Sequence, residues 1–183
     1  MNHHLDPAEI LRRSRVLFTR EQVDDAVGAM AAEINATYGD TPLILVTVLT
    51  GGMLPASWLA PRLGMPVQFD FVHATRYRGG TSGGELDFRV HPRMDFEGRH
   101  VLIVDDIYDE GRTLAALDEN FRERGAASVR SAVLTRKEHA RSVDHYEADF
   151  VGLDVPDVYV FGCGMDAYEE WRHLHEIRAL DLD

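Results

Sequence analysis

The chain has 183 residues and a formal net charge of -12, and this length fits a single domain spanning 1–183. An acidic surface argues against non-specific nucleic-acid binding, because that binding needs basic side chains. The single cysteine, Cys163, excludes an internal disulfide and is compatible with a reducing compartment, and we find no signal peptide or membrane-spanning run. We therefore expect a cytoplasmic protein with no nucleic-acid and no membrane partner.

Helical and strand patterns alternate along the chain. Apolar residues recur at helical spacing over residues 20–37, and Thr19 with Gln22 predicts a capping box at the start of that helix. The apolar run 43–49 predicts a buried strand, and a helix is predicted at 53–63. Further strands are predicted at 66–73, 87–91, 100–104, 129–134, 149–153 and 158–161, and a further helix at 112–124. This order favours an α/β fold with a mainly parallel central sheet flanked by helices, which binds ligands beyond the carboxyl ends of its strands.

Residues 75–86 interrupt this pattern. They are rich in Gly, Thr, Ser and Arg and contain too few apolar groups to pack against a core. We expect a mobile loop here. Its Arg76, Tyr77 and Arg78 could close over an anionic ligand as a lid.

The most informative segment is 101–113, where a short apolar strand ends at two adjacent acids, Asp105 and Asp106. Asp109 follows in the turn, and Gly111 leads toward the predicted helix. Such a turn presents free backbone N–H groups at the positive end of a helix dipole, where a phosphate is stabilised. Three acids beside a phosphate-binding turn suit a ligand that carries both hydroxyls and an anionic group, such as a ribose 5-phosphate. The alternative is a plain strand-to-helix turn with acidic N-caps.

The segment is neither a Walker A loop nor a dinucleotide-binding loop, because both glycine spacings are missing. Its order of four hydrophobic residues, two acids, two spacers, Asp, one residue, Gly, one residue and Thr closely resembles the phosphoribosyl-pyrophosphate (PRPP) motif of type I phosphoribosyltransferases. The glycine turn Thr50–Gly52 resembles the pyrophosphate-binding loop of the same family. Lys137 and the segment 149–162 are similar to the purine hood of hypoxanthine-guanine phosphoribosyltransferases, so the resemblance covers about residues 15–180.

The resemblance implies a fold, a reaction and partners. It implies a type I phosphoribosyltransferase fold with a flexible lid at about 75–86 and a small hood from the N-terminal segment and about 137–183. The implied reaction transfers the phosphoribosyl group from PRPP to N9 of hypoxanthine or guanine, with Mg²⁺ as cofactor, and yields IMP or GMP plus pyrophosphate. A homodimer or homotetramer is implied as well.

The resemblance also assigns roles to matching residues. Asp109 is expected to take or share the purine N7 proton as a general base. Lys137 is expected to donate to the purine O6, which favours 6-oxopurines over adenine. The remaining expected contacts are Asp105 and Asp106 with the ribose hydroxyls; Glu110, Gly111, Arg112 and Thr113 with the 5-phosphate; Thr50, Gly51, Gly52 and Arg172 with pyrophosphate; Ile107, Tyr159 and Val160 with the purine; Asp166, Asp105 and Asp106 with Mg²⁺; and Arg76 and Tyr77 in the lid.

Some residues depart from the family pattern. Glu110 replaces a common threonine, so its carboxylate must point away from the phosphate or be offset by a cation such as Arg112. The family often has a basic residue where Thr50 stands and tends to carry a cis peptide here, which we place at Leu49–Thr50. The histidines have no metal-ligand spacing, and the pair in His173-x-His175 is expected to face solvent.

Two other functions are compatible with these motifs. Some proteins of this fold sense PRPP and regulate nucleotide genes, but they need a basic face or an added DNA-binding domain. Alternatively, the enzyme could use another base, such as xanthine or a pyrimidine. Lys137 with Tyr159 and Val160 favours a purine, and the sequence does not rank hypoxanthine against guanine.

Overall fold

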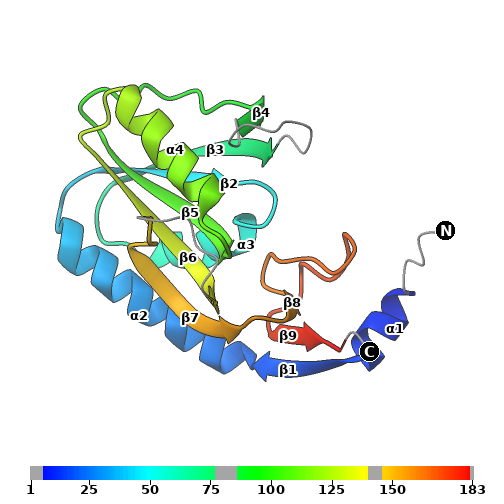
Figure 1. Cartoon of the computed structure of the whole chain (residues 1–183). Coiled ribbons are helices and arrows are strands. Elements are labelled where there is room, and N and C mark those ends of the chain that lie inside the picture. Colours follow the sequence, from blue (N-terminus) through cyan, green and yellow to red (C-terminus); the bar gives the residue numbers. More distant parts are fainter. Residues whose placement is uncertain (1–5, 77–85, 140–145, 182–183) are drawn as a thin grey trace.

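The structure, a computed structural model, describes residues 6–76, 86–139 and 146–181. The elements, labelled as in Figure 1, are α1 Pro7–Arg12, β1 Ser14–Phe18, α2 Arg20–Tyr38, β2 Leu43–Val48, α3 Met53–Leu59, the 3-10 helix Ala60–Arg62, β3 Val67–Arg76, β4 Leu86–Val90, β5 His100–Tyr108, α4 Arg112–Glu123, β6 Ser128–Glu138, β7 Phe150–Pro156, β8 Tyr159–Phe161 and β9 Ile177–Leu180. Within the described part of the chain, no helix is both long and apolar enough to cross a membrane.

Six strands form the central sheet in the order β4-β3-β2-β5-β6-β7. All neighbours are parallel except β3 and β4, which are antiparallel. The α/β prediction with a mainly parallel sheet is therefore confirmed. After β2, the strands β3 and β4 are added on one side of it, and β5, β6 and β7 are added on the other side. The direction in which strands are added therefore reverses between β2 and β5. In open α/β sheets, this reversal is where the loops separate and leave a crevice for a ligand.

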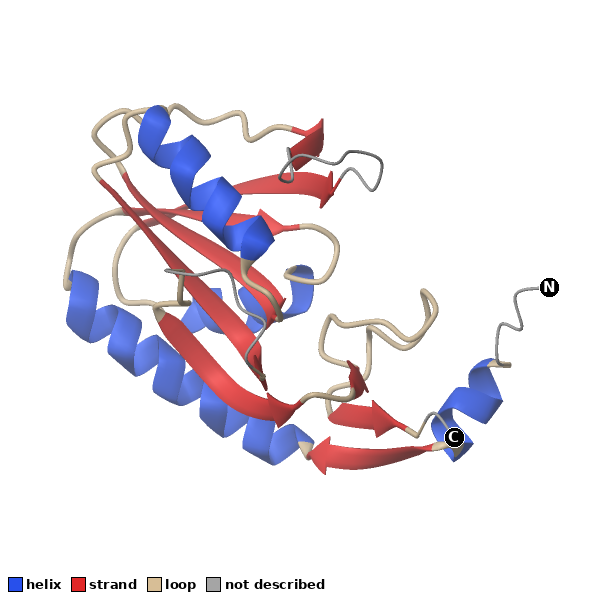
Figure 2. Ribbon diagram, in the orientation of Figure 1, coloured by secondary structure: helices blue, strands red, loops and turns tan. Residues whose placement is uncertain are grey.

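The two faces of the central sheet bury separate apolar clusters, because side chains alternate along each strand. In β5, Leu102 and Val104 pack in the cluster that contains α2 and α3, whereas Val101 and Ile103 pack in the cluster that contains α4. Figure 2 shows α4 on one face of the sheet and α2 with α3 on the other. Burial on both faces explains the apolar runs 43–46 in β2 and 101–104 in β5.

A small antiparallel sheet of three strands, in the order β1-β9-β8, lies beside the central sheet (Figure 1). Its central strand, β9, pairs with β1 from the N-terminal segment and with β8. Ile10 of α1 packs with Phe161 and Leu180 in the cluster beneath this sheet. Helix α1 and strands β1 and β9 were not predicted from the sequence. The range 137–183 predicted for the hood includes β7, which pairs with β6 in the central sheet.

Two predicted element boundaries are wrong. The strand predicted at 100–104 continues to Tyr108, because its backbone pairing with β6 runs on past the acidic pair. The helix predicted at 53–63 ends as an α-helix at Leu59 and continues as a 3-10 turn. Pro61 accounts for this change, since proline lacks an N–H and clashes with the carbonyl one turn earlier.

The predicted lid lies largely outside the described residues. The sheet covers more of the range 75–86 than expected, because β3 reaches Arg76 and β4 begins at Leu86. Tyr77 and the rest of 77–85 are not described.

Candidate active site

Three segments far apart in the sequence meet at the carboxyl edge of the central sheet: the β2–α3 turn, the β5–α4 loop and a turn after β8. A Cβ atom on Gly51 would lie 1.9 Å from Oδ2 of Asp106, and one on Gly164 would lie 2.1 Å from the carbonyl oxygen of Gly51. Gly164 also has φ +108°, a conformation that favours glycine. The three segments therefore touch through positions where no side chain fits.

The β2–α3 turn holds the residues predicted to bind pyrophosphate. The Leu49–Thr50 peptide is cis, as predicted. A Cβ atom on Gly52 would lie 2.5 Å from the Val104 carbonyl oxygen, so the turn packs directly on the backbone of β5. Thr50 is exposed at the tip of the turn. The turn consequently presents backbone groups, with little side-chain bulk, beside the end of β5.

Asp105 and Asp106 lie at the end of β5, and their electrostatics differ from those of surface acids. Asp106 is only 7 % exposed, and its backbone N–H donates to Oδ1 of Asp105 at 2.9 Å. Burial and then the neighbouring Asp106 charge raise the pKa of Asp105 well above its ordinary value. Burial also raises the pKa of Asp106, although Arg172 opposes the shift. Two such carboxylates are stabilised as anions by a bound cation or by hydroxyl donors.

The β5–α4 loop encloses a cavity of about 220 Å³ lined by residues 105–114. Gly111 has φ +75°, and a Cβ there would lie 2.5 Å from the Tyr108 ring, so the turn into α4 requires glycine. No side chain caps the first turn of α4, which leaves its N–H groups toward the cavity. The predicted phosphate-contacting residues Glu110, Gly111, Arg112 and Thr113 all line this cavity.

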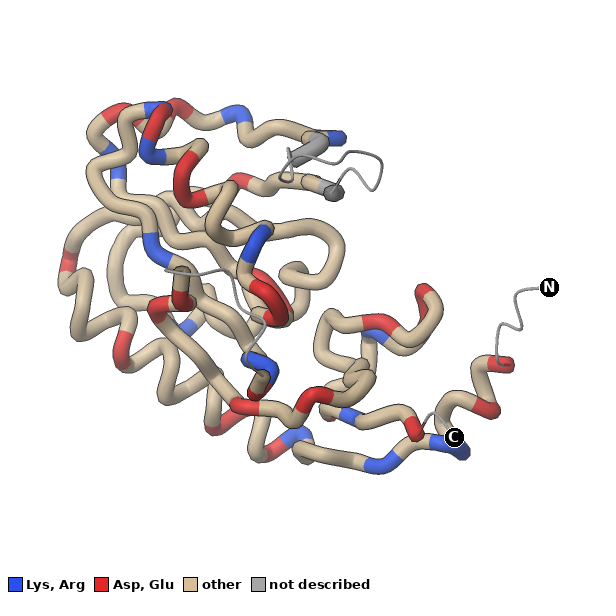
Figure 3. Tube along the Cα trace, in the orientation of Figure 1, with Lys and Arg blue, Asp and Glu red and all other residues tan. Residues whose placement is uncertain are grey.

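Glu110 pairs with a cation, which is one of the two arrangements expected for its carboxylate. Nε of Arg112 lies 2.9 Å from Oε2 of Glu110. Charged residues of both signs gather where the ends of β5 and β6 face the small sheet (Figure 3). The negative charge that Glu110 adds beside the predicted phosphate-binding turn is therefore paired locally.

A second cavity of about 200 Å³ lies between the ends of β5 and β6 and the small sheet. The four residues predicted to contact the purine all line it: Ile107, Lys137, Tyr159 and Val160. The rest of the lining consists of Met165 and three acids, Asp106, Asp109 and Asp166. The Tyr159 ring stacks on Tyr168, with ring centroids 5.9 Å apart. Lys137 is the only lysine in the chain. The cavity thus carries one compact cationic donor.

Asp109 borders both cavities and has two basic neighbours. Its Oδ2 lies 3.5 Å from Nζ of Lys137, and its Oδ1 lies 2.5 Å from Nε2 of His139. Burial alone would raise the pKa of Asp109, but His139 and Lys137 together lower it below the ordinary value. Asp109 is therefore held as a carboxylate. His139 was not predicted from the sequence. The available signal was its position two residues after Lys137 and directly after β6, because side chains two apart along a strand share a face.

Arg172 and Asp166, predicted to bind pyrophosphate and Mg²⁺ respectively, are paired with each other. Nη2 of Arg172 lies 2.6 Å from Oδ1 of Asp166, and Nη1 donates to the Gly164 carbonyl at 2.8 Å. These contacts fix Arg172 on the turn that touches Gly51. Arg172 therefore lies close to the Thr50–Gly52 turn, with which it is predicted to bind pyrophosphate.

The donor chemistry of the site fits a hard divalent cation. Asp105 and Asp106 are adjacent carboxylates whose charges repel each other, and Asp166 lines the same cavity as Asp106. Among the described residues, no group of three or more His, Cys, Asp or Glu side chains is arranged to hold a metal ion. Mg²⁺ suits such a site because it prefers oxygen ligands and is usually shared with substrate phosphates.

His175 was expected to face solvent, but it packs against other residues. Its ring stacks on Trp58 at a centroid distance of 4.1 Å, and its Nε2 lies 3.3 Å from Asp24. His173 is exposed, as expected. The stacked pair links the segment before β9 to α3, a tertiary contact with no local signature in the sequence.

Comparisons with known proteins agree with this geometry. Residues 18–170 match the family model described as a phosphoribosyl transferase domain. The chain is 35% identical over 167 residues to the hypoxanthine-guanine phosphoribosyltransferase of Streptococcus pneumoniae, and 35% identical to that of Bacillus subtilis, covering 91% of this chain and 92% of each relative. A crystal structure of a hypoxanthine phosphoribosyltransferase from Staphylococcus aureus superposes with a TM-score of 0.85 at 31% identity, over 91% of each chain. The chain therefore belongs to the phosphoribosyltransferase family, within its hypoxanthine-guanine phosphoribosyltransferase branch.

Proposed function

We propose that this enzyme salvages purines by transferring the 5-phosphoribosyl group of PRPP to N9 of hypoxanthine or guanine, with release of pyrophosphate. The observation that carries the proposal is the junction of the two cavities. Asp106, Ile107 and Asp109 line both of them, so a base in one cavity meets a ribose phosphate in the other. Holding two reactants in this geometry makes the reaction effectively unimolecular, which is worth about 7–11 kcal/mol of the barrier in favourable cases.

The purine is bound by the cavity between β5, β6 and the small sheet. Lys137, 15 % exposed, donates to the purine O6, while Ile107 and Tyr159 cover the faces of the ring and Val160 meets its edge. Adenine presents an amino donor at the same position, so it leaves Lys137 without an acceptor. Asp109 accepts the N7 proton as N9 bonds to C1, which prevents positive charge from building up on the base.

The PRPP substrate is bound by backbone groups and by acids. The amides of residues 110–113 at the start of α4 bind the 5-phosphate, and Asp105 and Asp106 accept from the ribose hydroxyls. The turn Thr50–Gly52 and Arg172 bind the pyrophosphate group. These donors stabilise the negative charge that develops on pyrophosphate as it leaves.

Asp105, Asp106 and Asp166 are the residues that would hold Mg²⁺ in the loaded site. The ion would supply charge neutralisation to the pyrophosphate leaving group. Asp166 would then exchange part of its pairing with Arg172 for the metal.

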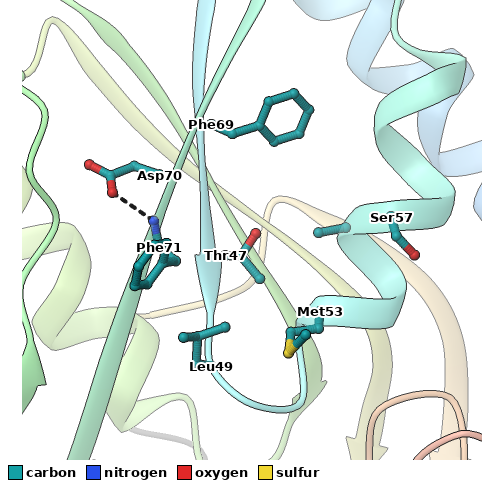
Figure 4. Close-up of a pocket in the computed structure, with 8 residues that line it drawn as sticks. Thr47, Leu49, Met53, Ser57, Phe69, Asp70 and Phe71 are labelled. Carbon is teal, nitrogen blue, oxygen red and sulfur yellow. Dashed lines mark hydrogen bonds between the residues drawn. The ribbon is translucent and has the colours of Figure 1, made fainter.

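A second copy of the chain is the proposed partner of an apolar hollow beside the site. This hollow, about 550 Å³, is lined by Thr47, Leu49, Met53, Ala56, Ser57, Phe69, Asp70 and Phe71 (Figure 4). Phe69 projects from β3 toward α3 (Figure 4). Phe69 and Phe71 are 58 % and 39 % exposed, and Met53 is 53 % exposed. Contiguous large apolar side chains of this kind mark an interaction surface. Met53 directly follows the pyrophosphate turn, so an associating copy would brace that turn.

One assay tests the proposed reaction. The protein is incubated with PRPP and Mg²⁺ and with each of hypoxanthine, guanine, xanthine and adenine, and the nucleotide formed is quantified by chromatography. Nucleotide is expected from hypoxanthine and guanine and not from adenine. Nucleotide from adenine alone, or from no purine, would contradict the proposal. Light scattering of the same preparation and of a Phe69→Arg variant tests the association, which the variant should abolish.

A further inference from the structure

We infer that His139 is a positioning residue that fixes the carboxylate of Asp109 for proton transfer; this inference rests on the proposed role of Asp109. The His139 side chain is only 6 % exposed, and its Nε2 lies 2.5 Å from Oδ1 of Asp109. A ring nitrogen this close to a carboxylate oxygen is a donor, because both atoms cannot act as acceptors.

The carboxylate needs this support because of where it sits. Asp109 is in a bend between β5 and α4, and its side chain is 47 % exposed, so its orientation depends on the contacts of its two oxygens rather than on regular structure. His139 lies just beyond the end of β6, two residues after Lys137. A histidine donor on Oδ1 therefore links the acid to the end of a central strand.

The two oxygens of Asp109 are consequently divided between two tasks. His139 occupies Oδ1, whereas Oδ2 lies on the Lys137 side, 3.5 Å from its Nζ and next to the purine cavity. During the reaction the N9 lone pair forms the bond to C1, the C1–O bond breaks toward pyrophosphate, and the N7 proton moves to Oδ2. His139 keeps its proton throughout, and Oδ1 of the protonated acid still accepts from it. The half-exposed carboxyl then returns the proton to solvent.

Two substitutions of similar size separate positioning from mere packing. The amide nitrogen of glutamine can reach the place of Nε2, whereas that of asparagine falls short of it. His139→Asn is expected to lower kcat about tenfold, because a misplaced catalytic group has costs of this order or larger. His139→Gln should restore most of the loss. KM for PRPP should stay unchanged in both variants, since the pyrophosphate turn and the α4 N-terminus are untouched.

A double variant tests whether His139 acts through Asp109. In the Asp109→Asn background, His139→Asn should cause no further loss, since coupled groups are non-additive. His100→Gln is the matched control: this half-buried histidine contacts Ser128 Oγ at 2.8 Å at the opposite end of β5, and its loss should leave kcat unchanged. Thermal unfolding of each variant verifies that the protein is folded.

The results distinguish failure of the positioning role of His139 from failure of the proposed role of Asp109 as general base. Near-normal turnover of Asp109→Asn removes the proposed role of Asp109, and the inference fails with it. An inactive Asp109→Asn with wild-type kcat in His139→Asn overturns the inference alone. Equal losses in folded His139→Asn and His139→Gln, or a loss that adds fully to that of Asp109→Asn, also overturn it.

Discussion

The two cavities of this enzyme are built in opposite ways. The cavity proposed to bind the 5-phosphate, the phosphate cavity, comes from one continuous segment, 105–114, and its proposed donors are backbone N–H groups at the start of α4. The cavity proposed to bind the base, the purine cavity, is assembled from β5, β6, β8 and the turn after β8, and most of its proposed contacts come from side chains. A local segment can be read from sequence order alone, whereas an assembled cavity depends on how distant strands pair. Substitutions in one cavity should therefore change the kinetic constants for PRPP, and substitutions in the other should change those for the purine.

The largest expected effect is at Asp109, the acid that lies at the junction. Asp109→Asn should lower kcat about a hundredfold or more, the usual scale for a positioned acid–base group. The asparagine keeps the shape and the donors around it, so the thermal midpoint should change little. Steady-state rates with saturating PRPP and hypoxanthine measure the effect. Retention of most of the turnover would exclude Asp109 as the general base.

The second largest effect is expected at Gly51, where a substitution should weaken the binding of PRPP without affecting the binding of the purine. Gly51→Ala places a Cβ 1.9 Å from Oδ2 of Asp106, so the pyrophosphate turn or the acid must move. We expect KM for PRPP to rise about tenfold or more, since small displacements of positioning groups have costs of this order.

Gly28→Ala is the matched control for this substitution. Gly28 lies within α2, and a Cβ there would meet no atom within 4 Å. Its kinetic constants should match the wild type, while helix propensity stabilises the fold by about 1 kcal/mol. An equal rise in KM for PRPP in both alanine variants would show that the clash with Asp106 is irrelevant.

Lys137 offers the reciprocal test on the purine cavity. Lys137→Ala leaves the purine O6 without its charged donor, which costs about 1.5–3 kcal/mol, or roughly 10- to 150-fold in kcat/KM for hypoxanthine and guanine. KM for PRPP should stay near the wild-type value. Lys137→Arg should rescue poorly, because the planar guanidinium is larger than the ammonium it replaces.

Chemical labelling gives an independent view of Lys137. It is the only lysine in the chain, so an amine-directed acetylating reagent has one side-chain target besides the terminal amine. Bound IMP or GMP should protect this lysine from acetylation, as measured by mass spectrometry of the peptide. Unchanged labelling in saturating nucleotide would place the base elsewhere.

The smallest expected effect concerns the pair of Glu110 and Arg112. Both side chains are substantially exposed, and such ion pairs contribute only about 0–1 kcal/mol. Arg112→Ala frees the Glu110 carboxylate beside the 5-phosphate, so KM for PRPP should rise about two- to fivefold at this energy scale. The double variant Glu110→Thr with Arg112→Ala should return toward the wild-type value. If it stays as weak as Arg112→Ala, the arginine acts on the phosphate and not through Glu110.

The sequence predicted the local features well. The α/β class and the capped helix α2 followed from periodicity and capping residues, and the turn at Gly111 followed from contiguous order. The close approach of Gly51 to Asp106 was not predicted, because two segments about fifty residues apart must fold before they touch.

The features that were missed depend on partners distant in the chain. Helix α1 and strand β1 are too short to give a clear periodic pattern, and the partner of β1, β9, comes from the other end of the sequence. The contact of His139 with Asp109 joins two loops, and His175 is held by Trp58. His175 has no neighbour in the sequence that indicates its contact with Trp58. Local pattern cannot report contacts that are made only in the folded state.

The strand order of the small sheet has a consequence for synthesis on the ribosome. β9 is the middle strand, hydrogen-bonded to β1 on one side and to β8 on the other. The two outer strands therefore have no partner in this sheet until β9 has been translated, although Tyr159 and Val160 of β8 line the purine cavity. The strands and loops around the phosphate cavity emerge earlier and can already pair with one another. A nascent chain halted before β9 would thus possess the phosphate half of the enzyme while its base-recognition half was still unformed.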